Sequence, residues 1–296
     1  MNQTLVENKY GHGALPLISD WRDHQWEKLA QSIAPFDWAT GYTASFSLPV
    51  KDQGGSFSCG GQAGSGLLAI VRQVLWNEPS TERSARYMYS QIFYTNGGTT
   101  LRDILNFAVN KGCADEVRVL SYQGGNPPTE AFMEDTSDNN AQADTSATAY
   151  KGLSYAFVNP DIDSYAEAIK ATGGAIMQIN GKNNGTWDSA EPLPPLNLAD
   201  SVWSHFVVCV GAEMRNGKKV IKIRNSWGSG VGEVGYQYIS EDYFASGCVL
   251  QGGVVYDPVM PSITPVAQQK IFLVTTLIAL LQKMKNLISG PTKQGV

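Results

Sequence analysis

The chain has 296 residues, of which 43% are hydrophobic and 17% charged, a composition typical of a compact protein with one large core or two smaller ones. Its formal net charge of −5 leaves no excess of positive charge to neutralise phosphates, so nucleic acid is not an expected partner. The longest apolar-leaning run, residues 271–281, is much shorter than the roughly 20 residues needed to cross a bilayer, so no transmembrane span is expected.

The N-terminal 13 residues contain no positively charged stretch followed by an apolar one, so no secretory signal is expected. This favours a cytoplasmic location or release by a non-classical route. The four cysteines, which include no CxxC pair and predict no metal site, are Cys59, Cys113, Cys209 and Cys248. Free thiols and one or two disulfides both fit this number.

Residues 1–34 mix glycine, proline and charged residues and contain a short helical candidate at residues 23–31, which together predict an extension rather than a domain. Apolar residues recur at three- and four-residue steps between Cys59 and Trp76, a spacing that predicts an amphipathic helix. The first turns of this helix are rich in glycine, which destabilises a helix by about 1 kcal/mol per residue relative to alanine. We therefore expect a central helix stabilised by burial, with little room beside it.

Further helices are predicted at residues 100–110 and 163–171, and the polar stretch 129–148 is predicted to be a loop or an interdomain crossing. Short β-prone segments separated by turn residues then predict an antiparallel sheet, at residues 175–179, 205–210, 219–223 and 235–239. A helical front half followed by a strand-rich back half indicates an α+β protein with two lobes.

The last part of the chain, residues 263–296, carries a short heptad-like seam formed by Leu273, Leu277, Leu280, Met284 and Leu287. A helix docked on its own core, self-association, and adsorption to a membrane surface all fit this pattern. The expected organisation is an extension at residues 1–34, a main domain at residues 35–262 and this helical tail.

Chemistry that pairs a cysteine with a histidine in the main domain must use His205, because the other two histidines, His12 and His24, lie in the extension. A thiol becomes a good nucleophile when a cation and a helix N-terminus stabilise its thiolate. Cys59 is placed where the predicted central helix begins, which makes it the candidate nucleophile.

The segment PVKDQGGSFSCGGQ, residues 49–62, resembles the signature of papain-like cysteine peptidases, in which a glutamine precedes the catalytic cysteine by six residues. NGG at residues 96–98 is similar to the glycine strand along which these enzymes align substrate. HFVVCVG, residues 205–211, is similar to the family's histidine strand, and NSWG, residues 225–228, to its asparagine block. The resemblance extends over about residues 34–245 and implies a papain-like fold with a helical left lobe, an antiparallel barrel-like right lobe and the active-site cleft between them.

The resemblance implies that Cys59 is the nucleophile, that His205 is the general base and acid, and that Asn225 orients the imidazole. It implies that Gln53 donates a hydrogen bond to the oxyanion. The substrate-binding residues that it implies are Gly97, Gly98, Ser204 and Trp227, of which Trp227 would also shield the histidine. No cofactor and no metal are implied, and the expected partner is a polypeptide substrate.

The sequence departs from the family pattern at three positions near the nucleophile and the asparagine. Ser56 stands where most members have a disulfide cysteine, and Gly60 and Val231 replace tryptophans. Residues 1–34 are too few for the family's helical inhibitory propeptide, so we expect a plug or short pro-segment, or no inhibition. Two other functions use the same fold or triad: a binding module without turnover, and a transamidase or cell-wall amide hydrolase.

Overall fold

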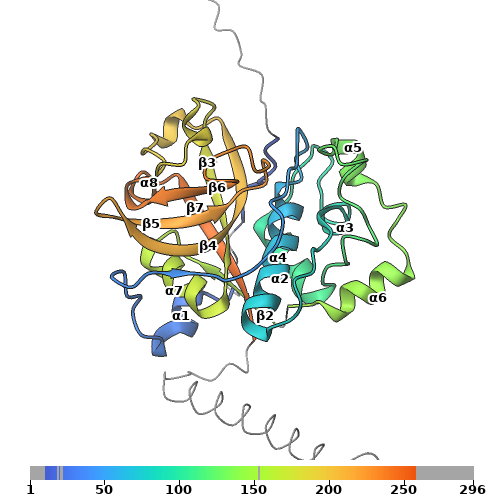
Figure 1. The fold of residues 1–296 in the computed structure, drawn as a ribbon, viewed down its shortest axis with the longest axis horizontal. Helices are drawn as coiled ribbons and strands as arrows, with labels where there is room; N and C mark the ends of the chain where they lie inside the picture. Colours follow the sequence, from blue (N-terminus) through green and yellow to red (C-terminus); the bar gives the residue numbers. More distant parts are fainter. Residues whose placement is uncertain (1–10, 19, 21–22, 153, 258–296) are drawn as a thin grey trace, which may run out of the picture. The chain divides into compact units, whose positions relative to one another are not determined.

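The computed structural model describes residues 11–18, 20, 23–152 and 154–257. Strands occupy one side of this part of the chain and the helices α2 to α6 the other (Figure 1). No helix in the described ranges is both long and apolar enough to pass through a lipid bilayer. The predicted heptad-like tail, residues 263–296, lies outside the described residues.

The strand-rich side is a seven-stranded antiparallel sheet with the order β2-β7-β3-β4-β5-β6, and β1 pairs with β4 off this path. The strands are β1 (Tyr42–Thr43), β2 (Ser154–Val158), β3 (Ala175–Gly181), β4 (Trp203–Arg215), β5 (Lys218–Arg224), β6 (Tyr236–Ser240) and β7 (Val249–Tyr256). The prediction of an α+β fold is confirmed. The barrel-like part of that prediction needs correction, because the sheet is open and its pairings do not close it into a barrel.

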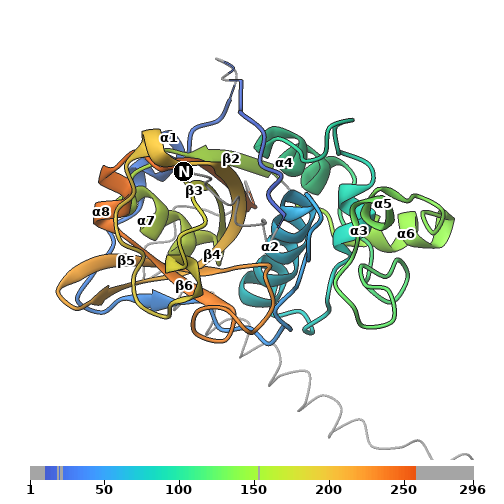
Figure 2. The same cartoon turned by 90° about the horizontal axis from the view of Figure 1, so that it is seen from above.

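Strand β4 is buried on both faces, which explains its unbroken apolar sequence. Val207 and Cys209 pack into one core with helix α7 (Ile162–Thr172), whereas Phe206 and Val208 pack into a second core with helix α2 (Cys59–Trp76). This alternation is the two-residue period of a strand. Seen from above, α7 and α2 lie against opposite faces of the sheet (Figure 2). The sheet is therefore the layer between the two helices, and β4 carries His205 into the region between the lobes.

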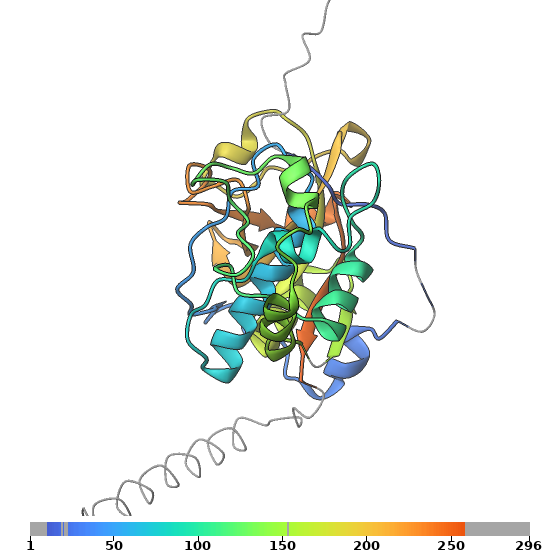
Figure 3. The same ribbon diagram turned by 90° about the vertical axis from the view of Figure 1, so that its right-hand side faces the viewer.

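The glycines at the start of α2 let it approach neighbouring helices closely. A Cβ on Gly61 would lie 2.6 Å from the carbonyl oxygen of Ala85, the first residue of α3 (Ala85–Tyr89). A Cβ on Gly64 would lie 2.6 Å from Ile104 in α4 (Leu101–Asn110). The predicted buried central helix is present with the predicted ends, and from the helical side it lies among α3 to α6 in front of the strands (Figure 3).

The polar stretch 129–148 is helical in two places, so its prediction as a loop was wrong. α5 (Glu130–Glu134) and α6 (Ala141–Ala149) are capped by Thr129 and Asn140. The side chains of these two residues accept hydrogen bonds from backbone N–H groups of the first turn. The other short helical segments are α1 (Trp26–Leu29), η1 (Ala30–Ser32), η2 (Thr186–Asp188), η3 (Leu198–Asp200) and α8 (Glu241–Ala245).

Candidate active site

Cys59 is the first residue of α2, and its thiol is completely buried. The backbone N–H groups of Phe206, Gly13 and Gly60 lie close enough to the thiol to favour its thiolate, but burial dominates and raises the pKa of Cys59 to about 12. Phe206 directly follows His205 on β4. The nucleophile candidate and the histidine strand are therefore brought together from opposite lobes.

His205 is fixed by a chain of side-chain hydrogen bonds. Its Nε2 lies 2.9 Å from Asn225 Oδ1, and Asn225 Nδ2 donates to Gln237 Oε1 at 2.7 Å. Gln237 Nε2 in turn donates to the backbone carbonyl of Trp187. Because Oδ1 of Asn225 can only accept, Nε2 of His205 carries the proton of the neutral ring, and Nδ1 keeps a lone pair. Nδ1 is buried without a hydrogen-bond partner, which leaves it available to exchange a proton.

Gln237 was not identified from the sequence. It lies on β6, opposite Ile223 of β5, and it is fully buried. A glutamine in a strand that is otherwise apolar toward the core was the only signal for it, because a buried amide must find hydrogen-bond partners. Its place behind Asn225 makes it the residue that orients the asparagine.

Trp227 lies over the imidazole of His205. Its ring stacks on the imidazole of His205 with the ring centroids 4.7 Å apart and an angle of 24° between the planes. It is 3% exposed and belongs to the core beside α7. Burial lowers the pKa of His205 to about 3, with a smaller contribution from the nearby His12.

Gln53 holds the loop that precedes α2. Its Oε1 accepts a hydrogen bond from Ser226 Oγ at 2.6 Å, and its Nε2 donates to the carbonyls of Ser56 and Gly11, both at 2.8 Å. Ser56 Oγ donates back to the Gln53 carbonyl at 2.7 Å. Ser56, which stands where the resembling family has a disulfide cysteine, thus closes the same loop through hydrogen bonds.

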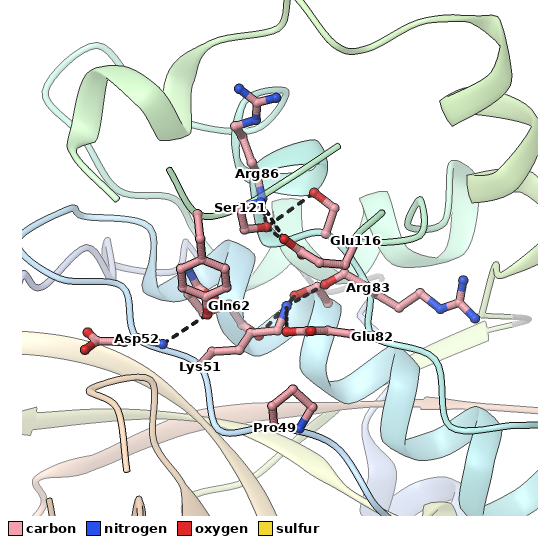
Figure 4. Close-up of polar contacts among 12 residues, drawn as sticks. Pro49, Lys51, Asp52, Gln62, Glu82, Arg83, Arg86, Glu116 and Ser121 are labelled. Atoms are coloured by element: carbon pink, nitrogen blue, oxygen red, sulfur yellow. Dashed lines mark hydrogen bonds and ion pairs between the residues drawn. The ribbon is translucent and has the colours of Figure 1, made fainter. Parts of the chain in front are cut away.

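A buried polar network supports the start of this loop from the helical side (Figure 4). Lys51 Nζ donates to Ser65 Oγ of α2 at 3.0 Å and to the carbonyl of Arg83, and it lies 4.0 Å from a carboxylate oxygen of Glu82. From the other lobe, Arg224 donates to the carbonyl of Pro49. Burial lowers the pKa of Lys51, while the nearby carboxylates of Glu116 and Glu82 raise it. The loop is therefore held by both lobes before it reaches Gln53.

Residues 11–15 lie across the site. Gly11 donates its N–H to the Gly54 carbonyl at 3.0 Å, and its own carbonyl accepts from Gln53 Nε2. Thr99 donates to the Gly13 carbonyl and accepts from the N–H of Leu15, both at 2.9 Å, so that the segment pairs with Thr99 in the parallel sense. The segment covers Cys59 and His205, each of which is 0% exposed.

The glycines of this segment are required by the close approach. A Cβ on Gly11 would overlap the carbonyl oxygen of Ser56, and a Cβ on Gly13 would overlap that of Phe57. His12, between them, stacks on Trp203 with the ring centroids 4.4 Å apart. The backbone of the Gly-His-Gly sequence therefore packs against the loop before α2, and its one ring packs against Trp203.

The predicted substrate-binding residues lie around the same segment. Gly97 and Gly98 adopt positive φ angles of 80° and 78°, and Gly98 uses its N–H and carbonyl internally, with Tyr89 Oη and the Tyr94 N–H. The backbone pairing with the segment falls one residue later, on Thr99. Ser204 accepts from the Ala14 N–H at 3.3 Å through its carbonyl.

The replacement of the family's tryptophan by Gly60 has a steric cause. A Cβ at this position would overlap the side chain of Thr99 and lie 3.0 Å from Ile104. Val231 is buried in the core beside α7. All four cysteines are buried free thiols, so the structure contains no disulfide among its described residues.

Comparison with known proteins agrees with this geometry. The model of the papain family cysteine proteases matches residues 34–257. A cysteine proteinase of Arabidopsis thaliana is 24% identical over 216 residues, which are 72% of this chain and 43% of that protein, so the chain spans less than half the length of this relative.

Two solved structures share the fold. Xylellain, a cysteine protease of Xylella fastidiosa, is 22% identical with a TM-score of 0.68, over 84% of this chain and 97% of that one. A procathepsin B of Trypanosoma congolense is 14% identical with a TM-score of 0.64, over 86% of this chain and 89% of that one. With three quarters of its length matched by the family model, the chain belongs to the papain family of cysteine proteases.

Proposed function

We propose that this protein is a cysteine peptidase that hydrolyses peptide bonds of extended polypeptides through a thioester acyl-enzyme on Cys59. The observation that carries the proposal is the hydrogen bond from His205 to Asn225 beside a cysteine at a helix N-terminus. This arrangement leaves one imidazole nitrogen free to take the thiol proton, and the positive end of the helix dipole stabilises the resulting thiolate.

In the proposed mechanism, Nδ1 of His205 takes the proton of Cys59, and the thiolate attacks the substrate carbonyl carbon. The negative charge that develops on the carbonyl oxygen is held by Gln53 Nε2 and the backbone N–H of Cys59, where one lost donor typically costs about 2.7–4 kcal/mol. The protonated His205 then gives its proton to the leaving amine as the carbon–nitrogen bond breaks. Water, deprotonated by His205, hydrolyses the thioester and restores the thiol.

Asn225 and Trp227 have positioning roles in this scheme. Asn225 holds the proton on Nε2, so that the free lone pair is on Nδ1, toward the reaction. Trp227 keeps water from that hydrogen bond by covering it. No cofactor enters the scheme.

We further propose that residues 11–15 act as the plug, so that the described state is a closed, resting one. Gln53 Nε2, the expected oxyanion donor, is occupied by the Gly11 carbonyl, and the N–H of Gly13 faces the thiol. Burial keeps both reacting groups neutral, because it raises the pKa of Cys59 and lowers that of His205. Substrate can enter only after this segment has moved.

Digestion of a random peptide mixture with mass-spectrometric identification of the products tests the proposed activity. We expect hydrolysed peptides with the wild-type protein and none with Cys59→Ala. The control variant Cys248→Ala, which removes a buried thiol that is hydrogen-bonded to the Leu196 carbonyl, keeps the activity. Peptides joined to an added amine would instead indicate a transamidase. Binding without cleavage by protein whose plug has been displaced would indicate a module without turnover.

A further inference from the structure

His12 occupies an aromatic pocket beside the imidazole of His205. Its ring is parallel to that of Trp203, with an interplanar angle of 10°, and meets Trp227 and His205 edge-on at centroid distances of 5.7 and 5.9 Å. The ring of Trp203 is itself held in place, because its Nε1 donates to Asn183 Oδ1 at 2.9 Å. A planar, uncharged ring fits this site.

Both ring nitrogens of His12 are covered by protein and have no hydrogen-bond partner. A neutral imidazole leaves one N–H group and one lone pair unpaired in this pocket and carries no charge. An imidazolium would leave two N–H groups and a positive charge without partners or water, which costs far more. His12 is the only side chain between Gly11 and Gly13. Its ring is therefore the main side-chain anchor of this part of the plug.

The groups around His12 offer no compensation for a positive charge. The nearest titratable neighbours are His205 on β4 and, through the Gly13 N–H, the thiol of Cys59. On the loop before α2, Asp52 accepts from the Gly54 N–H. Glu130, the first residue of α5, accepts from the N–H of Phe57 in the same loop. Both carboxylates are thus engaged with backbone groups, and neither bonds to His12.

We propose that His12 is an acid-sensitive latch, which holds residues 11–15 in the cleft while it is neutral and releases them when it is protonated. The proposal rests on the proposed function only in identifying the cleft as the active site. Opening itself is measurable without turnover.

The direction and size of the effect follow from linkage. Burial lowers the pKa of His12 from 6.5 to about 4, so the closed state binds fewer protons than an open one with a solvated imidazole. The closed state is therefore fully favoured above pH 6.5 and loses stability as the pH falls toward 4. At pH 5 the ratio of closed to open molecules is about 30-fold lower than at pH 7.5 through His12 alone. Burial also lowers the pKa of His205, so His205 weakens the closed state in the same direction as the pH falls, and His12 accounts for part of the total loss.

Hydrogen–deuterium exchange of the full chain, corrected for the intrinsic pH dependence, measures the protection of residues 11–15. We expect protection to fall by at least about 30-fold between pH 7.5 and pH 5 in the wild type. His12→Phe, which keeps a planar ring that cannot be protonated, removes the share that His12 contributes, so its loss of protection is clearly smaller than that of the wild type. His24→Phe, a matched change at the exposed histidine of the same extension, retains the full loss.

Equal loss of protection in the wild type and in His12→Phe overturns the proposal. If phenylalanine does not fit the pocket and the variant is open at every pH, the titration of His12 in the wild type, followed by NMR, decides. A pKa near 6.5 with residues 11–15 still protected contradicts the latch, and a pKa depressed toward 4 supports it. Because neither readout involves peptide cleavage, a protein that opens with acid but never cleaves refutes the proposed function and leaves the latch standing.

Discussion

Gly13→Ala tests whether the segment across the cleft controls access to Cys59. The added Cβ overlaps the backbone carbonyl of Phe57, which cannot move aside as a flexible side chain would. Moving Gly13 away breaks the hydrogen bonds from Thr99 to Gly13, from Gln53 to Gly11 and from Gly11 to Gly54. At about 0.5–1.5 kcal/mol each, these three destabilise the closed state by roughly 1.5–4.5 kcal/mol, or about 10- to 2,000-fold in its population relative to the open state.

The assay is the rate at which iodoacetamide alkylates Cys59 at pH 7.5, followed by peptide mass spectrometry. We expect the rate to rise by at least about 10-fold in Gly13→Ala. Gly55→Ala is the matched control, since a Cβ at this exposed glycine of the adjoining loop meets no atom within 4 Å. A folded Gly13→Ala protein that is alkylated at the wild-type rate would refute the account of the segment as a plug.

Two further changes test the support of the site. Asn225→Ala leaves His205 Nε2 and Gln237 Oε1 without their partner. We therefore expect kcat on a fluorogenic peptide to fall by about 10- to 100-fold with little change in KM. An unchanged kcat would contradict the positioning role of Asn225. Lys51→Met keeps a long buried side chain but removes the hydrogen bonds to Ser65 and the Arg83 carbonyl. We expect urea denaturation to show a loss of about 1–3 kcal/mol in the free energy of unfolding. Equal stability of the variant and the wild type would show that these hydrogen bonds make no net contribution to stability.

The fold was predictable where one residue pattern dominated. The apolar spacing from Cys59 to Trp76 gave the central helix with its observed ends, because three- and four-residue steps have no other regular explanation over 18 residues. The strand at His205 was shorter in the prediction than in the structure, where β4 extends to Arg215. Its last three residues, Glu213, Met214 and Arg215, pair with β5 although they do not continue the apolar run before them. Backbone pairing leaves no mark on the side-chain pattern.

The helices α5 and α6 were missed because α5 has only five residues and α6 has no clear apolar face. In α6 only Ala143 and Ala147, one turn apart, are buried, and two alanines do not define an apolar face. The capping residues Thr129 and Asn140 were the available signals.

The sequence singled out the candidate site residues but not the arrangement in which residues 11–15 lie over them. Motif order singled out Cys59, His205 and Asn225. In the structure, His205 is hydrogen-bonded to Asn225, and the backbone of Phe206, the residue after His205, lies against the thiol of Cys59. Nothing in the sequence placed Gly11 against Gln53, or His12 against Trp203, because these contacts join residues more than 40 positions apart without a shared pattern. The burial that raises the pKa of Cys59 and lowers that of His205 depends on this packing, which only the three-dimensional structure shows.

The most direct test of the central claim is covalent trapping of the nucleophile. The full chain is incubated with a peptidyl epoxide at pH 5 and pH 7.5, the adduct is located by peptide mass spectrometry, and peptide hydrolysis is measured in parallel. The account predicts a single adduct, on Cys59 among the four cysteines, and a loss of hydrolysis in proportion to its formation. Hydrolysis that persists after Cys59 is fully modified would contradict it.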